Sequence, residues 1–357
     1  MIAQLLALAQ WHQASGRASE AEAFYRRALD VEPEGAAIHR GLGTALDDQG
    51  RTAEAVACYS RCLTLAPDDA DGWCDMGMAL RRLTRAAEAI PAYRRAVRLD
   101  PGFVEAWFNL GNALTALGRF DEAISAYRAA LAQRSDDAEI WCNLGNALHQ
   151  RGRIGEAAAA AQRAVACRPD HAAALINLGN ALTEQGRFDE AIAQFGRALT
   201  VRPGDPAGPT GAGMALRQQG RVEEATASFR HAHRLSGDPG LEVKMALALP
   251  IIPRSLDHIA ETRGRMMERV TALTERGIRL ADPLAQVGQT CFYLAYHAAD
   301  DLPLQRAVAK LYQSACPGLT QDLADPAQWT DGRVHVGFVS QYWHQHTIAK
   351  LNLGLIR

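Results

Sequence analysis

The sequence predicts an all-α solenoid of stacked helix–turn–helix units, followed by a shorter region of different design. Three observations predict it. A Gly recurs at a spacing of 34 residues, a Gly-Arg pair recurs in register with it, and most units contain an Ala followed four residues later by an aromatic residue. A fixed period of this length indicates repeated supersecondary units, each of which buries its apolar face only against its neighbours.

The repeated positions can be followed through seven units, which together occupy residues 1–239. The Gly within the first helix of a unit is Gly43, Gly77, Gly111, Gly145, Gly179 and Gly213. The Gly-Arg pair begins at Gly16, Gly50, Gly118, Gly152, Gly186 and Gly220, with Thr84 in the remaining unit. The aromatic residue is Tyr25, Tyr59, Tyr93, Tyr127, Phe195 and Phe229, with Ala161 as the exception.

Each repeated residue type has a physical role. The first Gly lets the first helix approach a neighbour closely, and the Gly-Arg pair supplies a left-handed turn between the two helices. The Ala leaves room for the second helix, the aromatic ring fills the space beside it, and a Pro ends most units because it cannot continue a helix. With these residues the pattern resembles the tetratricopeptide repeat, which implies a superhelix with a long concave groove.

Asparagine recurs at two positions, three residues apart, on the first helix of three consecutive units. These residues are Asn109, Asn143 and Asn177 at the first position, and Asn112, Asn146 and Asn180 at the second. The spacing puts both positions on one helical face, so stacking would form a ladder along the groove. An amide offers donors and an acceptor, so the ladder could bind the backbone of an acceptor protein or peptide. The alternative is that these amides make structural hydrogen bonds within the repeats, and the sequence leaves both open.

Composition argues against several other classes of protein. Lys plus Arg is 38 and Asp plus Glu is 40, so the chain lacks the basic excess typical of nucleic-acid binding. The seven cysteines are scattered and form no CxxC pair, which favours a reducing compartment without disulfides or zinc. The longest apolar run, Met245–Ile252, is too short to span a bilayer. We therefore expect a cytoplasmic protein with no membrane contact and no cofactor, and the oligomeric state stays open.

After residue 239 the period stops, and residues 240–332 read as a helical linker or cap. Ser255 can cap a helix, Asp282 before Pro283 marks another helix start, and Asp301 opens a third. From residue 333 the pattern changes. Val334–Ser340 reads as a buried strand, and a helix follows from Thr347, which is the opening of a doubly wound α/β domain.

This last stretch carries a second resemblance. Arg333, the run Gly337–Ser340 and the segment His346–Leu351 look like the start of the catalytic region of O-linked N-acetylglucosamine transferases of the bacterial SPINDLY type. Phe292–His297 also resembles a segment that precedes that region in the family. The resemblance implies that residues 333–357 begin a Rossmann-like domain of GT-B type, which uses a UDP-sugar donor to glycosylate Ser or Thr of proteins recruited by the repeats.

The resemblance also implies a catalytic residue. His346 matches a family histidine near the sugar-transfer centre, where a neutral imidazole could accept a hydroxyl proton. The alternative is a histidine at a helix start that is bonded to backbone. A metal site of His335, His344 and His346 is not expected, because no Cys or carboxylate cluster joins them.

Only 25 residues follow from Arg333 to Arg357. Two Rossmann-like domains need on the order of 300 residues. We therefore expect the chain by itself to lack the donor site and to be inactive, as a fragment, a truncated product or an inactive remnant. Two functions remain open. The chain is either the acceptor-recruiting arm of a protein O-glycosyltransferase or a non-enzymatic tetratricopeptide scaffold for protein–protein interaction.

Overall fold

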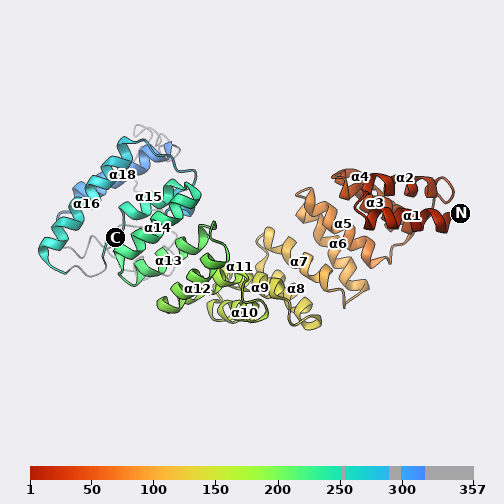
Figure 1. Ribbon diagram of the computed structural model, residues 1–357, viewed down its shortest axis with the longest axis horizontal. Helices are drawn as coiled ribbons and strands as arrows, with labels where there is room; N and C mark the ends of the chain where they lie inside the picture. The colour runs from red at the N-terminus through yellow and green to blue at the C-terminus, as the bar shows by residue number, and fades with distance from the viewer. Residues whose placement is uncertain (251–253, 289–298, 318–357) are drawn as a thin grey trace, which may run out of the picture.

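The computed structural model describes residues 1–250, 254–288 and 299–317, and the regular elements in these ranges are all helices. Fourteen helices cover the repeats (Figure 1). They are α1 (Ile2–Ala14), α2 (Ala18–Leu29), α3 (Ala36–Asp48), α4 (Thr52–Leu65), α5 (Ala70–Arg82), α6 (Ala86–Leu99), α7 (Val104–Ala116), α8 (Phe120–Gln133), α9 (Ala138–Gln150), α10 (Ile154–Cys167), α11 (Ala172–Glu184), α12 (Phe188–Val201), α13 (Ala207–Gln218) and α14 (Val222–Ser236). The predicted all-α tetratricopeptide solenoid is confirmed.

The helices form seven antiparallel pairs that stack into an arch. Each odd-numbered helix packs on the even-numbered helix that follows it, and each even-numbered helix packs on the next pair. Successive odd-numbered helices also contact one another from α1 to α13. In Figure 1, α5, α7, α9 and α11 lie along the inner side of the arch, with α6, α8, α10 and α12 outside them. The odd-numbered helices therefore line the concave face.

The 34-residue Gly and the aromatic residue form one contact that recurs along the solenoid. A Cβ added at Gly111 would lie 2.5 Å from the ring of Tyr127, which is 1% exposed. The same close approach joins four further pairs: Gly43 with Tyr59, Gly77 with Tyr93, Gly179 with Phe195, and Gly213 with Phe229. The absence of a side chain on the first helix thus makes the socket that the ring of the second helix fills.

The turns between paired helices are left-handed, as the Gly-Arg pattern predicts. Six of the seven turns use a Gly with φ between 69° and 82°. The seventh places Thr84 at φ 59°, a conformation that is costly for a β-branched residue. The loops between successive pairs are closed differently. The indole Nε1 of Trp107 donates to the carbonyl oxygen of Pro101 at 3.0 Å, and Trp73 and Trp141 make the same bond six residues back.

The helices beyond the repeats are α15 (Pro239–Ala246), α16 (Leu256–Glu275), α17 (Pro283–Gln286) and α18 (Leu302–Ala315). They enclose a separate apolar core that includes Val243, Met266, Val270 and Leu311. The predicted helix starts are confirmed. Ser255 accepts the His258 N–H, Asp282 accepts the N–H groups of Leu284 and Ala285, and α18 begins directly after Asp301. In the described ranges, no helix is long and apolar enough to cross a membrane.

Four of the expectations from sequence lie outside the described residues. They are the strand Val334–Ser340, the helix from Thr347, the catalytic candidate His346 and the segment Phe292–His297. The part of the chain that the structure describes contains helices and no strand, so the expected β–α opening of a Rossmann-like domain is not seen in it. The boundaries at residues 239 and 332 stay predictions.

Candidate functional site

The concave face is hollowed near its C-terminal end. A cavity of about 530 Å³ lies there, which falls in the size range of roughly 300–1,000 Å³ typical of ligand sites. Its walls come from α9, α11 and α13 of the solenoid, and from α15 and α17 beyond it. The site therefore joins the repeat groove to the helices that close it.

The seventh repeat is shaped to open this space. Its first helix, α13, has Pro209 at the position of Trp107, Trp141 and Leu175, and Gly211 at the position of Asn109, Asn143 and Asn177. Gly211 lies against the ring of Phe195, so the backbone of α13 packs closely on the preceding repeat and leaves the groove empty above it. Met214 and Leu241 give the cavity an apolar side, together with Ile176 from α11.

The polar lining from the solenoid helices includes His149, Asn180 and Glu184. Nε2 of His149 and Oε1 of Glu184 lie 2.7 Å apart, which links α9 to α11 across the groove. Asn180, one turn before Glu184, is exposed and makes no hydrogen bond within the described part of the chain. Its amide is therefore available to a ligand in the cavity.

Lys244 supplies the charge of the site. It lies on α15, is 8% exposed, and has no carboxylate within ion-pair distance among the residues that the structure describes. Burial lowers the pKa of its amine, the charge of Arg217 lowers it further, and Asp238 raises it again. A buried ammonium without a bonded partner costs free energy, which an anionic ligand would recover.

The end wall of the cavity is rigidly built. Asp238 caps α15 through the N–H of Gly240 at 2.9 Å, and also accepts a hydrogen bond from Gln286 Nε2 at 2.9 Å. A Cβ at Gly240 would lie 2.6 Å from Cβ of Gln286, so α17 rests directly on α15. Asp238 thus bonds to α15 and α17, and it forms no ion pair with Lys244.

The first row of the predicted asparagine ladder bonds to the preceding repeats. Asn143 Nδ2 donates to Asn112 Oδ1 at 3.0 Å, and Asn177 Nδ2 donates to the carbonyl oxygen of Cys142 at 3.3 Å. Asn109, 9% exposed, forms a hydrogen bond with the thiol of Cys74, whose pKa burial nevertheless raises to about 12. The structure thus places Asn109, Asn143 and Asn177 between repeats, and their part in peptide binding stays a prediction.

The second row is less occupied. Asn112 Oδ1 accepts hydrogen bonds from Tyr127 Oη and from Asn143, whereas Asn146 and Asn180 are exposed and have no side-chain hydrogen bond in the described ranges. Of the six asparagines, Asn180 lines the cavity. These same ranges contain no cluster of His, Cys, Asp and Glu that could hold a metal ion.

Comparison with known proteins agrees with the repeat geometry. The family model of the cilia and flagella-associated protein 70 C-terminal domain matches residues 2–214, which is more than half of the chain. The chain belongs to this family. A search of curated proteins gives no match.

Solved structures add a likeness of fold. The chain is 22% identical to YrrB, a tetratricopeptide protein described as having an unusual peptide-binding site, over 51% of this chain and 94% of that one, with a TM-score of 0.46. It is 26% identical to MamA over 48% of this chain and 93% of that one, with a TM-score of 0.44. It is 19% identical to the APC/C hetero-tetramer Cut9–Hcn1 over 85% and 55%, with a TM-score of 0.50. At this identity the last shows the fold alone.

Of the two resemblances drawn from the sequence, one is supported by the comparisons and the other is not. The tetratricopeptide resemblance is confirmed by the family model and by the structure. The transferase resemblance finds no support in them, because neither the family model nor the three structures concern a glycosyltransferase. Its diagnostic residues, including His346, also lie outside the described part of this family member.

Sequence reasoning missed the residue that gives the site its charge. Lys244 is one of three lysines among the 38 Lys and Arg residues of the chain, and it stands between Val243 and Met245. That isolation was the available signal. Its place at the groove could not be read from the repeat pattern, because Lys244 lies beyond the last repeat.

Proposed function

We propose that this chain is a binding module that captures an extended segment of a partner protein in its concave groove, at the cavity lined by α11, α13 and α15. The observation that carries the proposal is Lys244, a buried cation that opens into the groove without a carboxylate partner among the described residues. A Lys in this situation favours a ligand that brings a negative charge. The proposed ligand is therefore a peptide segment with an Asp, a Glu or a C-terminal carboxylate.

The rest of the cavity suits the remainder of such a segment. Asn180 can donate to a peptide carbonyl and accept from a peptide N–H, so it can bind backbone of any sequence. Ile176, Met214 and Leu241 offer an apolar surface for one side chain next to the acidic group. Met is unbranched and adapts to different shapes, which suits a groove that accepts more than one sequence.

Selection from a random library of linear peptides on the full chain tests the proposal. We expect the enriched peptides to contain an acidic residue beside an apolar one, and Lys244→Met to weaken the best peptide about tenfold, or about 1.4 kcal/mol. Lys310→Met is the matched control, because Lys310 is exposed on α18, outside the cavity lining. Equal affinity of the wild type and Lys244→Met for every selected peptide would contradict the proposal.

A narrower function rests on the resemblance at residues 333–357 and at Phe292–His297. If the chain recruits acceptors for a UDP-sugar-dependent protein O-glycosyltransferase, with His346 at its catalytic centre, then the captured segments adjoin Ser or Thr residues that carry the sugar. Mass spectrometry of partners bound to the groove decides this. O-linked N-acetylhexosamine next to the bound segment supports the narrower function, and unmodified partners leave the chain as a scaffold.

A further inference from the structure

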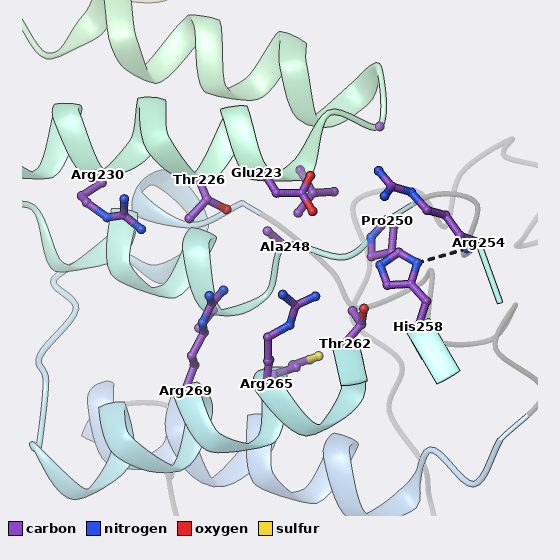
Figure 2. A pocket seen from close by; sticks show the side chains of 14 residues that line it. Glu223, Thr226, Arg230, Ala248, Pro250, Arg254, His258, Thr262, Arg265 and Arg269 are labelled. Carbon is purple, nitrogen blue, oxygen red and sulfur yellow. Dashed lines mark hydrogen bonds between the residues drawn. The ribbon is translucent and has the colours of Figure 1, made fainter. Parts of the chain in front are cut away.

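A second cavity lies away from the concave groove, between α14 and α16. Its volume is about 230 Å³, and the end of α15 and the segment after it contribute Ala246, Ala248 and Pro250 to its wall. Figure 2 shows side chains of both helices meeting across this space. Its described lining contains one acidic residue, Glu223, and the four arginines Arg230, Arg254, Arg265 and Arg269.

The polar lining residues of α14 and α16 lie on one face of each helix. On α14, Glu223, Thr226 and Arg230 are spaced by three and four residues. On α16, the cavity is lined by His258, Thr262, Arg265 and Arg269, spaced by four, three and four residues. Residues at such spacing share one helical face, so polar groups of both helices are directed into the same space.

These arginines differ from the Arg that follows the turn residue in six of the repeats, which has a carboxylate partner. In the second to seventh repeats, the Arg after the turn residue pairs with a Glu three residues later at 2.6–2.8 Å, as Arg119 does with Glu122. By contrast, Arg230 and Arg254 make no ion pair within the described ranges. Arg265 lies 3.6 Å from Glu261, with both side chains largely exposed. The cavity therefore holds positive charge that the protein leaves largely uncompensated.

A buried hydroxyl gives independent support. Thr262 is only 6% exposed, and its Oγ1 is fully buried without a hydrogen-bond partner. In Figure 2 this oxygen is directed from α16 toward the opposite wall of the cavity. Leaving a buried hydroxyl unsatisfied costs about 1–3 kcal/mol, so such a group is retained where something else bonds to it. An oxyanion bound at this position would accept a hydrogen bond from the Thr262 hydroxyl.

His258 adds a donor to the same wall. Its Nδ1 accepts the backbone N–H of Arg254 at 3.1 Å, so a neutral ring carries its proton on Nε2.

We propose that this cavity binds the diphosphate group of a small phosphorylated molecule. Four guanidinium groups against one carboxylate leave an excess of positive charge that matches a multiply charged anion better than a single carboxylate. Guanidinium groups bind phosphate oxygens through paired N–H donors. The Thr262 hydroxyl and the His258 ring supply neutral donors to the same oxygens, and the volume suits a diphosphate rather than a folded partner.

Isothermal titration of the full chain with inorganic pyrophosphate tests the site. We expect the wild type to bind, and the double variant Arg230→Gln with Arg265→Gln to weaken binding about tenfold or more. The control is Arg94→Gln with Arg128→Gln, two half-exposed arginines of the repeats that pair with Glu122 and Glu156. The proposal is overturned if the wild type does not bind pyrophosphate, or if the control loses as much affinity as the cavity variant.

Thr262→Val separates ligand binding from folding. It removes the hydroxyl and keeps the shape, so we expect weaker pyrophosphate binding together with an unchanged or higher thermal midpoint. Sulfate and an octaglutamate peptide complete the experiment. If sulfate at equal ionic strength displaces pyrophosphate as well as pyrophosphate itself does, or if octaglutamate displaces it, the assignment to a diphosphate group is wrong.

Discussion

The amide of Asn143 donates to Oδ1 of Asn112 at 3.0 Å, and through this bond two residues of the predicted ladder connect α9 to α7. The hydroxyl of Tyr127 donates to the same oxygen at 2.8 Å, so the aromatic residue of the fourth repeat joins the contact. The amides of the first row are therefore directed along the solenoid axis, from each repeat to the one before it.

This relationship predicts different effects for the two rows of asparagines. Asn143→Ala removes a half-buried interrepeat bond and should lower the free energy of unfolding by about 1 kcal/mol. Asn146→Ala, one turn further on α9, removes an exposed amide and should change it by less than about 0.5 kcal/mol. Urea denaturation followed by circular dichroism measures both. Equal losses in the two variants would show that the interrepeat bond does not stabilise the stack.

The glycine sockets offer a test with an internal control. Gly111→Ala forces a methyl group to within about 2.5 Å of the Tyr127 ring and should destabilise the protein by about 1–3 kcal/mol. Gly145 occupies the same repeat position, but Ala161 replaces the aromatic residue, and the nearest atom to an added Cβ is 3.4 Å away. Gly145→Ala should therefore be neutral or stabilising by up to about 1 kcal/mol. Thermal unfolding would refute the socket account if both variants lost stability alike.

Thr84 stores strain at the turn of the third repeat. Its φ of 59° is the conformation that six glycines adopt at the equivalent turns. Thr84→Gly should raise the free energy of unfolding by about 1 kcal/mol, because the left-handed penalty exceeds the entropy that Gly costs. The reverse change, Gly118→Thr, should lower it by a similar amount. A Thr84→Gly protein with a lower urea midpoint than the wild type would contradict this.

Asp75 predicts a pH-dependent stability difference. Burial raises the pKa of its carboxyl to about 6, against the opposing charge of Arg40. Because the folded pKa lies above the unfolded one, the contribution of this group to stability is present below about pH 4 and is lost as the pH rises through 6. Asp75→Asn should therefore be about 1–2 kcal/mol more stable than the wild type at pH 7 and close to it at pH 4. A difference that stays constant from pH 4 to pH 7 would rule out this origin.

The repeat architecture was predictable because the residues that form its turns and its interhelical contacts lie close together in sequence. The positive φ at Gly118, the socket at Gly111 and the ring of Tyr127 all lie within one 34-residue unit, so the period reveals their contacts. The helix starts at Ser255 and Asp282 were predictable for the same reason, since a cap bonds to backbone two or three residues away.

The cavity depends on contacts between segments that are distant in sequence, and the 34-residue repeat pattern does not reveal such contacts. Gln286 reaches Asp238 across 48 residues to build the end wall beside Lys244. The partner of Asn143 is likewise decided by how far one repeat rotates on the next, which residue spacing does not reveal. The division between bonded and unbonded amides in the described ranges therefore required the structure.

The central claim is that the groove at α11, α13 and α15 captures an acidic peptide segment. A selected peptide that carries a photoreactive group beside its acidic residue tests it most directly, with the cross-linked residues of the chain mapped by mass spectrometry. We predict cross-links to the cavity lining, at or near Asn180, Met214 and Lys244, and their loss in Lys244→Met. Cross-links confined to the outer helices α10, α12 and α14, unchanged in that variant, would contradict the account.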